Sequence, residues 1–182
     1  IQATVTETTV ANLGTISVDN SSRTVLNKFT FTVSDTAATA AELNTAQAKT
    51  SVAVDASNVA NIEASPASDL TTLYTGTTPS GIDDADIAVN DTTISASDYI
   101  AIDGYTTGTA TFTATTIEGA VADISTALSG LDANVVHESD ILVTVTDTTV
   151  SASDLDTVEG LTTGLVTVSA AATSISGTIT DV

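Results

Sequence analysis

The chain has 182 residues, 42% hydrophobic but only 3% aromatic, and its 23 acidic residues against 3 basic ones give a net charge of −20. The chain is too apolar to be disordered by composition and long enough for one domain or a short repeat array. The charge excludes nucleic acid and anionic membrane surfaces as partners, because both select basic protein surfaces.

The charge is also unevenly distributed. All three basic residues, Arg23, Lys28 and Lys49, lie before Thr50. The chain has no Cys and no apolar run of membrane-spanning length, so we expect neither disulfides nor direct membrane insertion. It begins without Met and ends inside a predicted helix, which favours a piece of a longer protein.

One phrase recurs three times at a constant interval. It reads DTAATAAEL from Asp35, DTTISASDY from Asp91 and DTTVSASDL from Asp147. Near the start, residues 5–10 resemble the strand phrase at 145–150. Recurrence at one fixed period is typical of repeat architectures. We therefore predict four segments: a partial N-terminal repeat or cap at 1–30, repeats at 31–86 and 87–142, and a truncated repeat at 143–182.

Each unit is predicted to contain a strand followed by a short helix, twice. The first helix begins in a capping box, a Ser or Thr followed three residues later by an acid: Thr39 with Glu42, Ser95 with Asp98, and Ser151 with Asp154. Gly104 and Gly160 are predicted to end two of these helices in a left-handed conformation.

The second helix of each unit is predicted at residues 69–76, just after Pro66, and at 123–130. A last one begins with the capping pattern of Thr178 and Asp181. Alternating apolar residues predict strands at 141–146 and 164–168.

A strand with one or two helical turns cannot bury its apolar faces alone. Stacking such units gives a continuous narrow core, and strand–helix–strand crossovers are right-handed in nearly all proteins. The predicted fold is thus an α/β repeat, a right-handed solenoid of parallel strands with short helices. The alternative is a string of small antiparallel β-sandwiches, which needs about seven strands per domain of about 100 residues, more than this repeat supplies.

Three candidate sites carry chemistry-bearing residues. The acidic run Asp83, Asp84 and Asp86 is a calcium candidate, because calcium prefers clustered carboxylate and carbonyl oxygens; the alternative is a solvated acidic turn. His137, the single histidine, has Ser139 and Asp140 nearby, but neighbours on one loop rarely form a catalytic triad, which favours a solvated loop histidine. The acids of the Ser/Thr-x-x-Asp/Glu phrases are interpreted as helix caps. We predict no catalytic residues, no enzyme activity, and calcium as the single candidate cofactor.

The phrases at 143–155 and 33–38 resemble repeat segments of giant secreted bacterial surface, adhesin and S-layer-like proteins, of cyanobacterial and marine kind, that often end in repeats-in-toxin calcium modules. The resemblance covers about residues 31 to 182, and the Gly-Gly-x-Gly-x-Asp calcium motif is absent. It implies a secreted, extracellular, cell-surface location and a structural role.

The expected function is a structural module of a surface layer, filament or adhesin stalk. Its expected partners are like copies of itself or further repeats of the same chain. The alternative is an adhesin segment that binds surface polysaccharide or a receptor. That alternative gains support if Tyr74, Tyr99 and Tyr105 line one exposed face and loses support if they lie in the core. An elongated polysaccharide lyase is the third class, disfavoured because such enzymes use Lys or Arg and residues 50–182 contain neither.

Overall fold

The computed structural model describes residues 2–16, 28–76, 78–129 and 134–177, and within them the chain alternates between short strands and short helices. The helices are α1 (Val10–Gly14), α2 (Ala40–Gln47), α3 (Ala67–Thr75), α4 (Ala96–Asp103), α5 (Val121–Ser129) and α6 (Ala152–Glu159). The strands are β1 (Gln2–Thr8), β2 (Lys28–Val33), β3 (Ala37–Thr39), β4 (Asn61–Ser65), β5 (Asp86–Val89), β6 (Thr93–Ser95), β7 (Ala110–Phe112), β8 (Thr116–Gly119), β9 (Val135–Val136), β10 (Leu142–Val145), β11 (Thr149–Ser151), β12 (Val166–Val168) and β13 (Ser174–Ser176). The predicted α/β class, with parallel strands and short helices, is confirmed.

All the described strand pairs are parallel, and the two strands of a pair are separated by a nearly constant distance along the chain, as Ala37 with Asn61 and Asn61 with Asp86. The sheet orders are β1-β2, β3-β4-β5-β7-β9, β6-β8-β10-β12 and β11-β13. We call the segment that carries the chain from one strand to its partner a rung. Parallel pairing gives no support to antiparallel sandwiches. The predicted repeat boundaries at residues 31, 87 and 143 stay a prediction.

The sheets start at regular intervals along the chain. After the first sheet, the leading strands β3, β6 and β11 begin at Ala37, Thr93 and Thr149, which is the interval of the sequence repeat. β4 directly precedes helix α3, and on one side it pairs with β3, which directly precedes helix α2. On its other side it pairs with β5, which is followed by another strand, β6, before the next helix. Successive rungs are therefore staggered sideways, and each sheet ends while the next has already begun.

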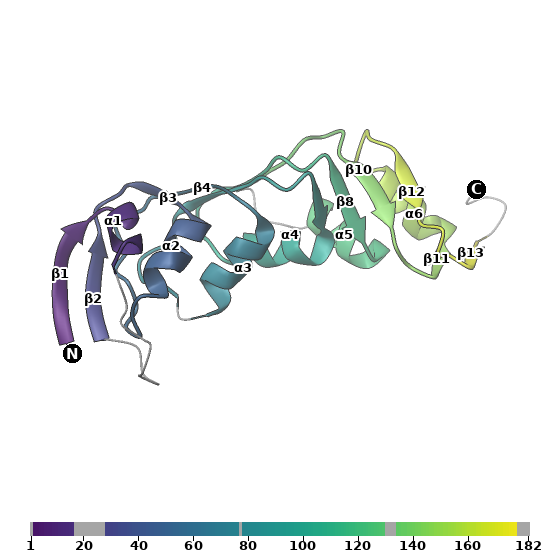
Figure 1. Ribbon diagram of the computed structural model, residues 1–182. Helices are drawn as coiled ribbons and strands as arrows, with labels where there is room; N and C mark the ends of the chain where they lie inside the picture. The colour runs from purple at the N-terminus through teal and green to yellow at the C-terminus, as the bar shows by residue number, and fades with distance from the viewer. Residues whose placement is uncertain (1, 17–27, 77, 130–133, 178–182) are drawn as a thin grey trace.

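The molecule is elongated, with its two ends far apart (Figure 1). The helices follow one another along it in chain order, and each contacts the next, from α1 with α2 to α5 with α6. Every rung therefore touches mainly its neighbours.

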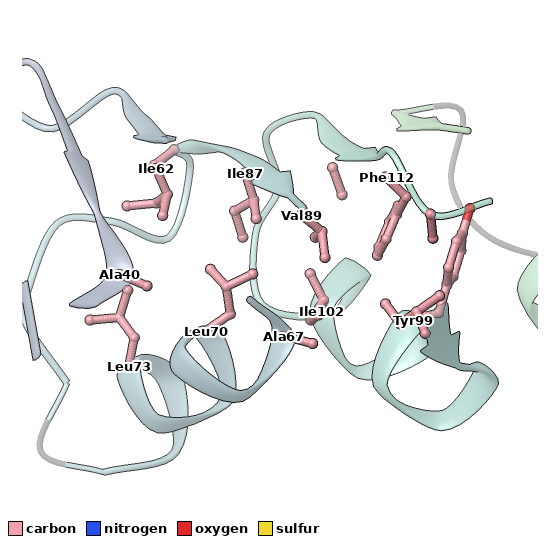
Figure 2. Packing of buried hydrophobic residues seen from close by; sticks show 14 of the residues in the cluster. Ala40, Ile62, Ala67, Leu70, Leu73, Ile87, Val89, Tyr99, Ile102 and Phe112 are labelled. Carbon is pink, nitrogen blue, oxygen red and sulfur yellow. The ribbon is translucent and has the colours of Figure 1, made fainter. Parts of the chain in front are cut away.

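The core is a narrow layer between the strands and the helices (Figure 2). Ile62 and Ile87 lie opposite each other on β4 and β5, and Leu70 and Leu73 of α3 point towards them from below. All four side chains are buried. Full burial of such a side chain stabilises a fold by about 1.5–3 kcal/mol, so each rung adds its own share of the core.

The helix starts follow the predicted capping boxes. Thr39 and Glu42 form both hydrogen bonds of the box, and the hydroxyls of Ser95 and Ser151 accept from the N–H groups of Asp98 and Asp154. Pro66 is the N-cap of α3. The box at Thr178 and Asp181 lies outside the described residues.

The predicted left-handed helix ends are wrong. Gly104 and Gly160 both have φ of −68°, in the right-handed region. Their N–H groups donate to carbonyls within the preceding turn of the helix, for Gly104 those of Ile100 and Ile102. This closes the last turn without a change of handedness. Among the described glycines, positive φ occurs at Gly81 and Gly119.

Tyr99 carries a polar atom that the core does not satisfy. Its ring is fully buried and stacks on Phe112 with centroids 3.8 Å apart, and its Oη has no hydrogen-bond partner among the described residues. The other two copies of the repeat phrase have Leu43 and Leu155 at this place. An unpaired buried hydroxyl costs about 1–3 kcal/mol. We therefore expect Tyr99→Phe to raise the melting temperature in a calorimetric scan, and a lower one would show that the hydroxyl is bonded.

Candidate functional site

The predicted calcium ligands lie on the exposed turn before β5 and at the first residue of that strand, Asp86. Asp83, Asp84 and Asp86 are all exposed. The carboxylate of Asp86 accepts a hydrogen bond from the N–H of Thr109 at 2.7 Å, and the backbone carbonyl of Asp83 accepts one from Thr107 at 2.8 Å. Within the described part of the chain no three acidic or histidine side chains are grouped closely enough to share a metal ion. The arrangement thus gives the calcium prediction no support, and it stays a prediction.

A melting experiment tests this turn. We expect calcium and magnesium at equal ionic strength to give the same melting temperature, because a net charge of −20 gains from any divalent counterion. Differential scanning fluorimetry in chelator, magnesium and calcium measures it. A rise specific to calcium, and absent in Asp84→Asn, would show that the turn binds calcium.

His137 is half-buried rather than fully solvated. Its ring meets that of Tyr99 edge-on, with centroids 6.1 Å apart, and Nδ1 is 2.9 Å from the carbonyl oxygen of Glu138. Neither contact involves the side chains of Ser139 or Asp140. The ring therefore packs against Tyr99, a role that the sequence did not indicate.

The three tyrosines do not line one exposed face. Tyr99 is in the core, whereas Tyr74 and Tyr105 are half-buried and stack on each other with centroids 4.9 Å apart. The Tyr74 hydroxyl donates to the carbonyl of Ile82 at 3.1 Å. Burial raises the pKa of the Tyr74 phenol, and the negative charge of Asp83 raises it further. Tyr74 thus stays neutral and keeps its donor across the physiological range.

The most regular polar feature joins each odd-numbered helix to the following rung. The first N–H group of α1, at Val10, donates to Asp35 Oδ2 at 2.6 Å. Ala67, the first residue of α3, does the same to Asp91 at 2.6 Å, and Val121 of α5 to Asp147 at 2.7 Å. Helix N-termini have unpaired N–H groups and a positive dipole end, so a carboxylate there satisfies a donor and interacts favourably with the dipole.

These aspartates are the first residues of the recurring phrase, and each shortly precedes the next helix, as Asp91 precedes α4. The sequence showed their spacing but not their role. Each aspartate recurs in the repeat phrase but does not cap the helix that follows it. That combination was the signal in the sequence that these residues contact a neighbouring rung.

The intervening helix α2 is fastened by a different residue. The Ala40 N–H donates to the hydroxyl of Ser65, which is buried on β4 in the next rung, at 2.9 Å. At the equivalent place beside α4 stands Gly119, where an added Cβ would lie 3.1 Å from the Cβ of Ala96. α2 thus has a neutral contact with the following rung, and at that place beside α4 the glycine has no side chain to make one.

A second recurring contact uses threonine. The hydroxyls of Thr50, Thr106 and Thr162, spaced at the interval of the repeat, donate to backbone carbonyls of the preceding rung at 2.6–2.7 Å. The hydroxyls of Thr106 and Thr162 also accept from the N–H groups of Gly108 and Gly164, both at 2.9 Å. Each glycine lies where two rungs come very close. A Cβ at Gly108 would be 2.7 Å from the carbonyl oxygen of Asp84.

Together these contacts hold rungs at a fixed spacing, and they bring no nucleophile, base and acid together among the described residues. No family model matches the chain, and neither a curated protein nor a solved structure is significantly similar to it. No described helix is long and apolar enough to cross a bilayer. The candidate functional site is therefore the set of contacts between rungs.

Proposed function

We propose that the chain is a structural module of an extracellular surface layer, filament or adhesin stalk. It folds as a right-handed solenoid of parallel strands with short helices, and it works mechanically rather than catalytically. Its partners are further repeats of the same kind or like copies of the chain.

The observation that carries the proposal is the recurrence of one inter-rung hydrogen bond, from a helix N–H to Asp35, Asp91 and Asp147. Parallel strands paired from rung to rung and helices in consecutive contact are what a stack of like units requires. The right hand follows from the general preference of parallel strand–helix–strand crossovers. In such a stack each rung transmits load to its neighbours through strand pairing.

The surface supports an exposed location outside the cell. No Lys or Arg follows Thr50, while 19 Asp and Glu residues do. Such an acidic surface keeps neighbouring molecules apart and soluble where counterions are plentiful, as they are outside the cell. The resemblance of residues 31–182 to repeat segments of giant secreted bacterial proteins points the same way.

Immunogold electron microscopy of the source cells, with antibodies raised against the chain, tests this function. We expect label along a surface layer or on extracellular filaments. Label confined to the cell interior, or native material made of isolated globular monomers, would contradict it.

The adhesin alternative gains nothing from the geometry. Sugar-binding platforms use exposed aromatic faces, whereas Tyr99 is buried and Tyr74 and Tyr105 cover each other. We therefore do not propose a polysaccharide-binding role, and receptor binding stays a prediction.

A further inference from the structure

The helices follow one another along the molecule (Figure 1), and a groove recurs between each odd-numbered helix and the next even-numbered one. The groove has a volume of about 180 Å³ between α1 and α2, about 430 Å³ between α3 and α4, and about 230 Å³ between α5 and α6. The first, second and fifth residues of the odd-numbered helix line each groove: Val10, Ala11 and Gly14, then Ala67, Ser68 and Thr71, then Val121, Ala122 and Ser125. Because the same helix positions line all three, the groove is a repeated feature of the fold.

The even-numbered helix supplies a carboxylate to each groove. It is the acid of the predicted capping box, which is Glu42 in α2, Asp98 in α4 and Asp154 in α6. Glu42 and Asp154 are exposed and Asp98 is half-buried. All three carboxylates can therefore be reached by a group that enters the groove from solvent.

The groove between α3 and α4 is the largest of the three and brings two carboxylates together. Asp91 Oδ2 accepts from the N–H of Ala67 at 2.6 Å. Asp98 Oδ2 accepts from the hydroxyl of Ser95 at 2.7 Å. In both aspartates the other oxygen, Oδ1, has no hydrogen-bond partner among the described residues. Four hydroxyl groups line the same groove, those of Ser68, Thr71, Thr93 and Ser95.

The charge in this groove is negative in spite of the two helix starts beside it. Each helix N-terminus has about half a unit of positive charge, so α3 and α4 together contribute about one unit. Asp91 and Asp98 contribute two negative charges, which leaves the groove with an excess of about one. No Lys or Arg follows Lys49 in the chain to compensate it. The groove therefore favours a cation.

A groove of another kind lacks this charge. It lies between α2 and α3, has a volume of about 320 Å³, and is lined by amides and hydroxyls, such as those of Asn44, Gln47 and Thr72, with no acid. Among these four grooves the carboxylates are thus confined to those that separate an odd-numbered helix from the next even-numbered one. The groove between α2 and α3 serves as a comparison within the same molecule.

The shape and chemistry of the acidic grooves match a lysine side chain. Small residues (Ala, Gly, Ser, Thr and Val) line the space beside the carboxylate, where an unbranched methylene stem can pack. The compact ammonium group has three donors for oxygens that lie in different directions. The planar guanidinium of arginine instead prefers one carboxylate with both oxygens free. Asp91 and Asp98 each offer a single free oxygen, which favours lysine.

The repetition of the groove sets the spacing of the ligand. Packed helices lie about 8–10 Å apart, so equivalent grooves, which are two helices apart, recur about every 16–20 Å. An extended polypeptide covers that distance in about five or six residues. One extended segment with regularly spaced lysines can therefore enter several grooves at once.

We infer that the three acidic grooves bind lysine side chains of an extended basic polypeptide, one lysine in each groove, with the lysines about six residues apart. The partner is a different chain, because this one has two lysines, Lys28 and Lys49, which are far apart in the sequence. The inference goes beyond the proposed structural role, since it gives the stack a partner other than its own copies.

Nuclear magnetic resonance of the full chain labelled with nitrogen-15 tests the inference. The probe is a peptide with three lysines, each separated from the next by five glycine or serine residues, in about 0.15 M salt, which screens attraction between distant charges. We expect the amide signals of Ser68 and Ala122, in two acidic grooves, to shift. The signals of Asn44 and Thr72, in the groove without an acid, are expected to stay in place.

A second peptide of the same composition has its three lysines adjacent. It reaches one groove at a time, so we expect it to bind about tenfold more weakly than the spaced peptide, because it lacks the effective concentration that linked sites provide. Equal or tighter binding of the clustered peptide would overturn the inference, since the net charge of the chain would then explain the binding. Shifts of equal size in acidic and neutral grooves would overturn it too.

Two pairs of variants separate the groove from the surface charge. Ser68→Leu fills the groove between α3 and α4 without a change of charge, whereas Thr75→Leu adds the same side chain at an exposed position of α3 outside the grooves. We expect Ser68→Leu to abolish the shifts in its own groove and to keep those at Ala122, which also shows that the variant is folded. Thr75→Leu is expected to bind like the unaltered chain.

The second pair removes one charge in each variant. Asp98→Asn is expected to weaken binding of the spaced peptide about tenfold, because it removes one charge-assisted contact. Asp156→Asn, at an exposed position of α6 that lines none of the acidic grooves, is expected to leave it unchanged. Equal effects of the two variants would overturn the inference. A surface layer seen by microscopy without this binding would remove the lysine sites and leave the proposed function standing.

Discussion

Gly108→Ala lowers the free energy of unfolding by about 3 kcal/mol, because the new methyl group meets backbone that has no room to move. Its Cβ would lie 2.7 Å from the carbonyl oxygen of Asp84 and 2.8 Å from that of Ala85. These atoms belong to the preceding rung, which the hydroxyl of Thr106 fastens at the same place. The methyl group must push two rungs apart. Urea unfolding followed by circular dichroism measures the loss.

Gly104→Ala is the matched control for this variant. Gly104 ends helix α4 with φ of −68°, and an added Cβ would lie 3.4 Å from its nearest neighbour, an ordinary contact. We expect its stability to be unchanged or slightly raised, since alanine restricts the unfolded chain more than glycine does. Equal losses for the two variants would show that rungs do not approach closely at Gly108.

Asp91→Ala lowers the stability by about 2 kcal/mol, because it leaves the first N–H of α3 without its acceptor and removes a negative charge from the helix N-terminus. The Ala67 N–H donates to Asp91 at 2.6 Å, and Ala67 is buried, so water cannot readily replace the carboxylate. In a domain of this size such a loss lowers the melting temperature by about 4–8 °C. Thermal unfolding followed by circular dichroism measures it.

Two companions separate the hydrogen bond from charge in general. Asp91→Asn keeps an oxygen acceptor and is expected to lose about half as much as Asp91→Ala. Asp156→Ala removes an exposed acid of α6 and is expected to change stability by less than about 0.5 kcal/mol. If Asp91→Ala and Asp156→Ala behave alike, the contact between rungs contributes nothing, and only the net charge matters.

Local signals predicted the helix starts well. Thr39, Ser95 and Ser151 cap their helices as the sequence indicated, because a capping box depends on residues three positions apart and on nothing farther away. The helix ends were less predictable. Gly104 and Gly160 satisfy the glycine pattern of a left-handed end, but the chain continues directly to the next rung in right-handed geometry.

The pairing of strands was beyond reach of the local pattern. The three-residue strands β3 and β6 have no alternation long enough to identify them, and they exist because β4 and β8 offer them an edge. The sideways stagger, by which β4 joins β3 to β5, depends on contacts between different rungs, such as Ala38 with Ile62 and Ile62 with Ile87. The period of the repeat was visible in the sequence, whereas its division among overlapping sheets was not.

The candidate site was predictable in spacing and unpredictable in role. Asp35, Asp91 and Asp147 were aligned from the sequence alone, but each binds the first N–H of a helix in the preceding rung. Asp83, Asp84 and Asp86 were predicted to bind calcium because their charges are close together in the sequence. Adjacent carboxylates repel each other and separate on an exposed turn, whereas the contacts between rungs use single residues repeated far apart.

Small-angle X-ray scattering of the chain in dilute solution is the most direct test of the stacked architecture. A compact globular domain of this length has a radius of gyration of about 16 Å. We predict a radius clearly above that value and a distance distribution with a long tail, from an elongated particle whose ends lie far apart (Figure 1). A radius at the compact value with a symmetric distance distribution would contradict a stack of rungs and, with it, the proposed structural role.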